Sequence, residues 1–392
     1  MITFDEAQAI VAARVEPLGS ETIALAEAAN RTLAAPLFAR ADAPRQAVSM
    51  MDGYAVIEQA TAPGVRYEVI GESRAGRGFA GSVEAGEAVR IFTGAPLPRG
   101  ANYVIMQEHA AREGNHVTFT KGYGPAAHVR PAASDFAAGD TLVPAGARLG
   151  PRAMVAAAAA DVSQVTVARR PKVAIISTGD ELAAPGTAHL ARDAIPESVS
   201  YGIAAMVTEA GATLESRLTG ADDLDALTQM AGKPLGEADL LIVTGGASVG
   251  ERDFAKAMFA PHALDLWFEK IAIKPGKPVW LGEAGGTIVL GLPGNPTSAM
   301  VTAALFLRPI LARLQGSGET LPWRNLPLAG PLDATGSRET FVRARWDEAG
   351  LVPLENQLSG AQAALLEADW LIRRPPLGAA LESGKTVSAL RF

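Results

Sequence analysis

The alternation of apolar strands and helices between residues 169 and 316 constrains the fold of this chain most strongly. Near-continuous apolar runs such as KVAIIS (172–177), DLLIV (239–243) and TIVLGL (287–292) stand between segments with helical periodicity. Strands that are apolar on both sides need cover on both faces, as in a parallel sheet flanked by helices. We therefore predict a doubly wound α/β domain over residues 169–316.

The other segments predict three further units, since 392 residues exceed what one core usually organises. Residues 46–130 place Gly and Pro every few positions between short alternating runs, which is typical of a small all-β module. Residues 1–45 and 131–168 contain helical segments, and we expect them to form one linker domain that is interrupted by the β module. Residues 317–392 lose the helical period and predict a C-terminal β domain.

Local signals also set several helix bounds. Thr3 and Glu6 predict a capping box that opens the first helix. We expect a short extended stretch and a second helix within residues 20–37. Two further helices are predicted, from Asp222 to near Gly232 and from Pro296 to about Leu307.

Composition limits the partners and the location. The net charge is −7, from 35 basic and 42 acidic residues without a Lys/Arg run, which argues against nucleic acid or an anionic membrane as the main partner. Asp5 and Glu6 stand where a signal peptide would carry positive charge. The absence of cysteine excludes disulfides and thiolate chemistry. We expect a soluble, cytoplasmic protein that binds neither nucleic acid nor membrane.

Three glycine-containing loops follow three of the predicted strands. In parallel sheets, ligands bind outside the carboxyl ends of the strands, so these loops are expected to form one cradle. Glycines let backbone N–H groups approach a ligand closely, which suits an anion, although each loop alone is also explained as an ordinary turn. The candidate residues are Thr178, Gly179, Asp180 and Glu181; Thr244, Gly245, Gly246, Ser248, Gly250 and Asp253; and Pro293, Gly294, Asn295 and Pro296.

The third loop, in GLPGNPTSAM (291–300), is stiffened by two prolines. Pro296 suits the first helical position, and Asn295 suits the N-cap before it. A loop that is already rigid loses less conformational entropy when it binds a ligand. We therefore interpret this turn as part of the binding site.

Charged residues beside these loops complete the candidate chemistry. Glu181 and Asp253 would repel a bound phosphate unless Mg²⁺ lay between them, although acidic residues at helix N-termini are also common. Lys274 and Lys277 flank a Pro-Gly turn that could clamp an oxyanion or be a solvated hairpin tip. The five histidines show no metal-ligand spacing.

Six ordered motifs together resemble the MoeA family, the molybdopterin molybdenumtransferases, whose eukaryotic counterpart is the E domain of gephyrin. The resemblance also extends more loosely to SGAQAALLEADWLIRRPP near the C-terminus. The motifs are SMMDGYAV (49–56), IFTGAPLPRGANYVIMQE (91–108), PKVAIISTGDEL (171–182), DLLIVTGGASVGERDF (239–254), IKPGKPVWLG (273–282) and GLPGNPTSAM (291–300).

The resemblance implies four domains, the central one like the smaller MogA proteins, and an elongated homodimer. The active cleft would lie between the central domain of one subunit and the β domain of the other. The implied reaction inserts molybdate into the dithiolene of adenylylated molybdopterin, with Mg²⁺-dependent release of AMP. Transient contacts with a MogA-type adenylyltransferase and with molybdoenzyme apoproteins are expected on the same ground.

Site residues are carried over by position within the motifs. Asp52, Thr93, Glu181 and Asp253 match family residues associated with activity, with Glu181 and Asp253 as the implied Mg²⁺ ligands. The implied pterin- and phosphate-binding positions are Ser248 with its neighbouring glycines, Lys274, Lys277 and the Pro293–Pro296 turn.

Three departures from the family pattern keep alternatives open. The usual Asp-Ser/Thr-Asn segment reads Glu197-Ser198-Val199, the Gly-Glu-Asp segment reads Ala133-Ser134-Asp135, and the Gly-Ala-Asp segment ends in Asn102. The main alternative is a catalytically impaired relative that acts as a pterin-binding or scaffold protein. A MogA-like adenylyltransferase or a CinA-type amidohydrolase fits less well, because neither explains residues 1–168 together with GGASVGERD.

Overall fold

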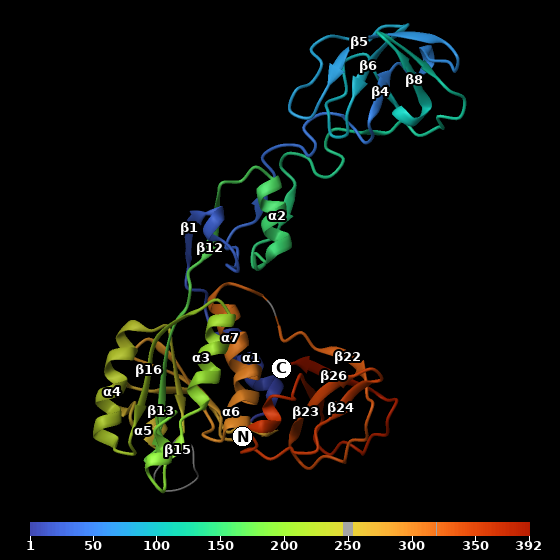
Figure 1. Ribbon diagram of the computed structural model, residues 1–392. Coiled ribbons are helices and arrows are strands. Elements are labelled where there is room, and N and C mark those ends of the chain that lie inside the picture. Colours follow the sequence, from blue (N-terminus) through green and yellow to red (C-terminus); the bar gives the residue numbers. More distant parts are fainter. Residues whose placement is uncertain (246–253, 319) are drawn as a thin grey trace.

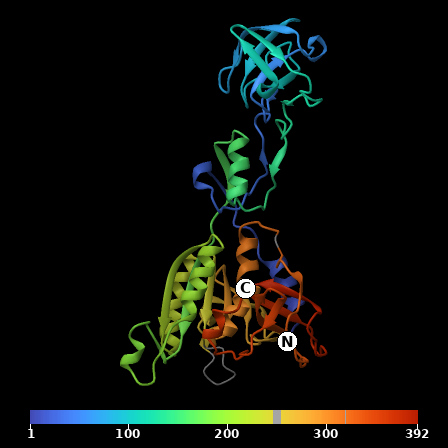
Figure 2. The ribbon, with the colours of Figure 1, turned by 45° about the vertical axis from the view of Figure 1, so that its right-hand side comes forward.

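The computed structural model describes residues 1–245, 254–318 and 320–392. It is an extended molecule with an upper module (residues 46–130), a linker (residues 20–45 and 131–168) and a lower body (residues 1–15 and 172–392), as Figures 1 and 2 show. The chain starts in the lower body, rises through the linker into the upper module, and returns through the linker. The upper module is therefore an insertion.

The upper module is built on one six-stranded sheet with the order β7-β4-β6-β5-β9-β8. The short alternating runs of the sequence supply these strands, and their inward side chains form a small aromatic core of Tyr54, Tyr67 and Phe119. The strands are β4 (Gly53–Val56), β5 (Arg66–Ser73), β6 (Glu87–Ile91), β7 (Tyr103–Met106), β8 (Ala110–Glu113) and β9 (His116–Phe119).

The linker consists of short strand pairs and one helix. The extended stretch predicted within residues 20–37 is present, since Thr22 and Ile23 lie in a strand that pairs antiparallel with Gln164–Ala168. The second helix predicted there is wrong, because only the 3-10 turn Leu25–Glu27 follows. β-branched residues favour such an extended, paired stretch. The elements are β1 (Ser20–Ala24) with β12 (Gln164–Ala168), β2 (Leu37–Phe38) with β11 (Thr141–Val143), and α2 (Pro151–Ala159). The pair β3 (Val48–Ser49) with β10 (Val129–Arg130) belongs to the upper module, where the chain enters and leaves it.

The central sheet of the lower body has the order β16-β13-β17-β21-β20-β18. Its first four strands are parallel, as predicted. Strand β20 pairs antiparallel with β21, because the Gly285-Gly286 turn joins them as a hairpin, and the edge strand β18 pairs antiparallel with β20. The strands are β13 (Lys172–Thr178), β16 (Thr213–Gly220), β17 (Leu240–Thr244), β18 (Asp265–Glu269), β20 (Trp280–Ala284) and β21 (Thr287–Leu292).

Two helices of this part run further than their sequence signals indicate. Helix α4 (Leu224–Glu237) continues past Gly232 because Leu235 is buried in the core with Leu227. Helix α6 (Pro296–Thr302) continues through a π-helical turn, Ala303–Leu307, into α7 (Arg308–Leu314). The combined helix is long and apolar enough to cross a membrane, but 78% of it is buried inside this protein, as expected of a core helix. The other helices are α3 (Val199–Glu209) and α5 (Phe254–Ala257).

The C-terminal part forms a second six-stranded sheet that is not separate from the central part. Strand β19 (Ile273–Lys274) leaves the central part and pairs with β23, so the two parts share this sheet. The remaining strands are β22 (Arg324–Pro327), β23 (Glu339–Asp347), β24 (Gly350–Pro353), β25 (Trp370–Arg374) and β26 (Thr386–Arg391).

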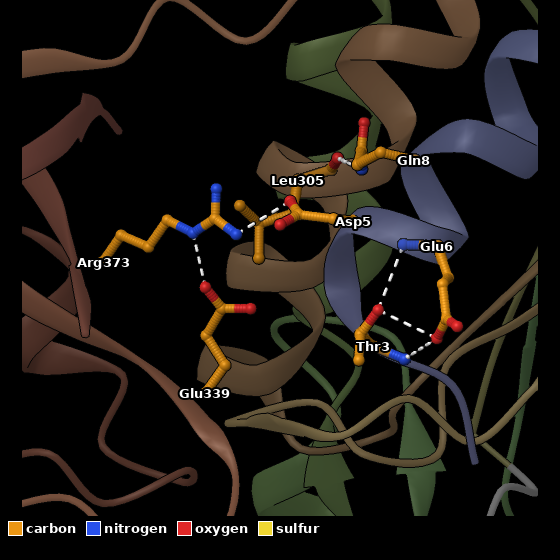
Figure 3. A network of polar contacts seen from close by, with 7 residues as sticks. All are labelled: Thr3, Asp5, Glu6, Gln8, Leu305, Glu339 and Arg373. Atoms are coloured by element: carbon orange, nitrogen blue, oxygen red, sulfur yellow. Dashed lines mark hydrogen bonds and ion pairs between the residues drawn. The ribbon is translucent and has the colours of Figure 1, made fainter. Parts of the chain in front are cut away.

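Helix α1 (Phe4–Arg14) lies in the lower body, although the sequence places residues 1–45 in the linker domain. The predicted Thr3–Glu6 capping box is present. Figure 3 shows α1 between the combined helix Pro296–Leu314 and the C-terminal sheet. On the side of the sheet, Asp5 accepts a 2.8 Å hydrogen bond from Arg373, which also binds Glu339.

Packing explains why α1 lies there. Phe4 is fully buried between Phe306 of the central part and Phe341 of the C-terminal sheet. The apolar face of α1 is therefore one of the surfaces on which both parts are assembled. The bounds of the other predicted domains remain a prediction.

Candidate active site

Three loops start side by side at the carboxyl edge of the central sheet. Strands β13, β17 and β21 are parallel neighbours, and Ser177 is paired with Thr244, which is paired with Leu292. The residues that follow each strand must therefore lie close together. This arrangement is the one that the alternating sequence pattern predicts.

The loops touch at their glycines. Gly245 has a φ of +92°, and a Cβ on it would lie 2.2 Å from the carbonyl oxygen of Thr178. A Cβ on Gly294 would lie 3.2 Å from the Cα of Gly245. We call Thr178, Gly245 and Gly294 the glycine cradle, because only glycine fits the contact between the first two loops.

The cradle contains a polar atom that needs a partner. The Oγ1 of Thr178 is buried and has no hydrogen-bond partner within the described residues. Burying a hydroxyl without a partner costs about 1–3 kcal/mol. A bound ligand that accepts or donates a hydrogen bond here would recover that cost.

Glu181 lies next to the cradle. Its carboxylate folds back over Gly179, so that a Cβ on this glycine would meet a Glu181 oxygen at 2.7 Å. Glu181 is exposed, and no hydrogen bond or ion pair engages its carboxylate in the described part of the chain. Carboxylate oxygens beside the cradle suit a hard cation such as Mg²⁺.

The Pro293–Pro296 turn leads from β21 into α6. Asn295 occupies the N-cap position, but its side chain makes no capping hydrogen bond and is exposed. The C-terminal part reaches the same helix end, because Thr297 donates from its N–H to the Ser359 carbonyl at 3.0 Å and from its hydroxyl to the Ala361 carbonyl at 3.2 Å. The Asn295 amide is thus available to a ligand.

Lys274 and Lys277 lie on a turn that is fixed to this helix. A Cβ on Gly276, between them, would lie 2.1 Å from Cγ2 of Thr302 in α6. Both lysines are exposed, and neither forms an ion pair with any described residue. Two free ammonium groups on a rigid turn can bind an oxyanion.

Sequence reasoning missed Arg343. This side chain is 1% exposed, binds the carbonyl oxygens of Asn356 and Leu358, and keeps one guanidinium nitrogen without a partner in the described part. It thereby fixes the loop whose next residues, Ser359 and Ala361, contact Thr297. The only sequence signal is a charged residue inside the apolar strand FVRARW.

Asp52 and Thr93 form a second group, in the upper module. The Oδ1 atom of Asp52 accepts bonds from the Thr93 N–H at 2.7 Å and from the Thr93 hydroxyl at 2.8 Å. Both bonds hold the pKa of Asp52 below its ordinary value of 3.8, and the bond from the backbone N–H has the larger effect. Its second oxygen makes none of these bonds, so an ionised carboxylate faces outward.

Replacing Thr93 with Val should raise the pKa of Asp52 toward its ordinary value, because the hydroxyl donor is lost while the backbone donor remains. The Asp52 carboxylate would then take up its proton at a higher pH than in the wild type. The measurement is a ¹³C NMR titration of the Asp52 carboxyl group. A Thr120→Val control in the same module should leave the titration unchanged, and an unmoved midpoint in Thr93→Val would contradict the assignment.

The two groups do not meet within one chain. The linker separates the upper module, with Asp52 and Thr93, from the central sheet, with the cradle and Glu181 (Figures 1 and 2). Four candidate residues, Gly246, Ser248, Gly250 and Asp253, lie outside the described residues. Among the described residues, no group of three or more acidic or histidine side chains is placed to hold a metal ion.

The three departures from the family pattern have local explanations. Val199 starts α3 and is buried in the core. Asn102 accepts a bond from the N–H of Glu58 at 2.8 Å. Ser134 accepts a bond from Arg130 at 3.2 Å, next to Ala133 with a φ of +55°. The contacts of Asn102 and Ser134 lie outside the central sheet and do not involve the glycine cradle.

Comparisons with known protein families cover nearly the whole chain. Residues 2–160 match the MoeA N-terminal region (domain I and II), residues 174–313 match a probable molybdopterin binding domain, and residues 325–392 match the MoeA C-terminal region (domain IV).

Individual relatives agree. The molybdopterin molybdenumtransferase of Nostoc sp. is 35% identical over 82% of this chain and 76% of its own length, and molybdopterin molybdenumtransferase 2 of Mycobacterium tuberculosis is 33% identical over 90% of each. A crystal structure of a MoeA protein from a Pyrococcus species is 28% identical and covers 100% of this chain and 99% of its own, with a TM-score of 0.82.

Proposed function

The chain belongs to the MoeA family of molybdopterin molybdenumtransferases, and we propose on this premise that it inserts molybdate into adenylylated molybdopterin and releases AMP. It is thus a transferase of molybdenum cofactor biosynthesis. The observation that carries the proposal is the glycine cradle, in which the Thr178 hydroxyl and the nearby Glu181 carboxylate have no hydrogen-bond partner among the described residues.

The groups around the cradle fit the substrates. The phosphates of adenylylated molybdopterin would bind the N–H groups of the glycine loops and the Thr178 hydroxyl. Lys274 and Lys277 would bind the molybdate dianion or a phosphate. Glu181, with Asp253, would hold Mg²⁺, which when bound neutralises the phosphate charge during loss of AMP. A water molecule would attack the phosphorus of the molybdopterin phosphate, so that the phosphoanhydride bond breaks and AMP leaves with the bonding electron pair. The two dithiolene thiols would form Mo–S bonds, and their protons would leave with one molybdate oxygen as water.

Asp52 and Thr93 enter the proposal through a second copy of the chain. Because the linker keeps them away from the cradle of their own subunit, we infer a homodimer in which the upper module of one copy completes the site of the other. The outward oxygen of Asp52, ionised at neutral pH, would then act on the substrate as a base or a metal ligand.

The proposed setting is the cytoplasm, where reduced dithiolene sulfurs persist. The substrate would come from a MogA-type adenylyltransferase, and molybdoenzyme apoproteins would take the product. Both contacts would be transient.

The test is AMP release from adenylylated molybdopterin, measured with and without molybdate and Mg²⁺. Glu181→Gln should lower the rate at least about a hundredfold. Glu209→Gln, an exposed carboxylate at the far end of α3, serves as the control. AMP release that does not depend on molybdate and Mg²⁺ would overturn the proposal. Binding of adenylylated molybdopterin without any AMP release would overturn it in favour of a pterin-binding protein.

Asn295→Ala should weaken binding of adenylylated molybdopterin about tenfold while lowering the free energy of unfolding by well under 1 kcal/mol. The reason is that the Asn295 side chain makes no capping bond that the substitution could remove. Isothermal titration and urea denaturation measure the two effects. A stability loss of about 1 kcal/mol with unchanged affinity would identify a simple helix cap.

A further inference from the structure

Glu197 is a buried carboxylate close to the cradle that the proposed function does not use. It is 5% exposed and follows directly after strand β15 (Ile195–Pro196), which pairs with β14 (Leu182–Ala183). Two backbone bonds secure this pair, from Ile195 to the Glu181 carbonyl and from Glu197 to the Ala183 carbonyl, each at 2.8 Å. The segment therefore returns the chain to the loop that carries Glu181.

The carboxylate accepts three hydrogen bonds. One oxygen accepts from the Ser200 N–H at 2.9 Å and from the Ser177 hydroxyl at 3.3 Å, and the other accepts from the Ser200 hydroxyl. No Lys or Arg pairs with Glu197 in the described part of the chain. Every partner donates, so both carboxylate oxygens of Glu197 act as acceptors.

The network reaches both strands that start the cradle. The Thr244 hydroxyl donates to the Ser177 hydroxyl at 3.0 Å, and Ser177 donates onward to Glu197. Ser177 immediately precedes Thr178, and Thr244 immediately precedes Gly245. One acceptor, Glu197, thus fixes the direction of both hydroxyls and links the carboxyl ends of β13 and β17.

We propose that Glu197 is a positioning residue that sets the geometry of the glycine cradle through Ser177 and Thr244. Glutamine at this position would turn an NH₂ group toward at least one of the donors and break the one-way order of the network. The contact of Gly245 with Thr178, 2.2 Å from a Cβ position, tolerates little displacement. The inference rests on the proposed function only for the identity of the ligand.

The experiment compares Glu197→Gln with Glu6→Ala, which removes the capping carboxylate of α1 and lies outside the cradle. Hydrogen–deuterium exchange of the ligand-free protein should show faster exchange in residues 172–183 and 239–245 for Glu197→Gln only. In AMP release, the KM for adenylylated molybdopterin should rise about tenfold while kcat changes less than about threefold, because the cradle binds substrate and transition state alike.

Ser177→Ala covers the case in which Glu197→Gln does not fold, because it keeps the carboxylate and removes only the hydroxyl that connects Glu197 with Thr244. It should reproduce the exchange and KM effects in weaker form. Unchanged exchange in both segments, or a thermal destabilisation with unchanged KM, would make Glu197 a simple cap of α3 and overturn the inference. If the wild type releases no AMP, the proposed function fails, and the exchange comparison still decides the role of Glu197.

Discussion

Mixing Asp52→Ala subunits with Glu181→Gln subunits should restore AMP release to about a quarter of the wild-type rate, although each variant alone is inactive. If the site combines the upper module of one copy with the cradle of the other, each mixed dimer contains one site with both substitutions and one intact site. Random exchange makes about half of the dimers mixed, and each of these is half active. The measurement is the AMP release rate after co-refolding equal amounts.

A second mixture serves as the control. Wild type mixed equally with the Asp52→Ala/Glu181→Gln double variant should retain about a quarter of the wild-type rate, because every site of a mixed dimer then lacks one group. If each site lay within a single subunit, this mixture would show about half of the wild-type rate of AMP release, and the first mixture would show no AMP release. That outcome would refute the shared site.

Gly245→Ala should be the most damaging single substitution in the cradle. The methyl group would meet the Thr178 carbonyl at 2.2 Å, and the backbone φ of +92° disfavours any side chain. We expect the free energy of unfolding to fall by about 2–4 kcal/mol and the affinity for adenylylated molybdopterin to fall more than about tenfold. Urea denaturation and isothermal titration measure these effects.

Gly286→Ala is the matched control, since Gly286 has a φ of +83° in the β20–β21 turn and nothing within 4 Å of a Cβ position. It isolates the backbone strain, about 1–2 kcal/mol, and should leave substrate affinity unchanged. Equal losses of stability and affinity in both variants would show that the contact with Thr178 does not matter.

The features that the sequence predicts best are the parallel strands of the central sheet and the loops that follow them. Apolar runs of the central part identify strands, and the rule that parallel strands end at one edge brings Thr178, Gly245 and Gly294 together before any coordinates are known. The antiparallel edge of the sheet was not predicted, because an apolar run does not reveal its direction.

Contacts between distant segments escape such reasoning. Glu197 appears in the sequence only as a departure from a motif, and its role depends on Ser177 and Thr244, which the fold brings beside it. The role of Arg343 likewise depends on a distant loop, because its guanidinium group binds the carbonyl oxygens of Asn356 and Leu358. The second helix predicted within residues 20–37 is absent, because Leu25–Glu27 forms only a 3-10 turn after the paired strand Ser20–Ala24.

The position of α1 has a consequence for how the protein is made. The bond between Arg373 and Asp5 joins residues 368 positions apart, and Phe4 shares its core with Phe341. During synthesis on the ribosome, the upper module can fold as soon as it emerges, whereas the first helix must wait for almost the last strand. The buried face of this helix, Phe4, Ala7 and Val11, therefore lacks its complete set of packing partners until nearly the whole chain has been synthesised.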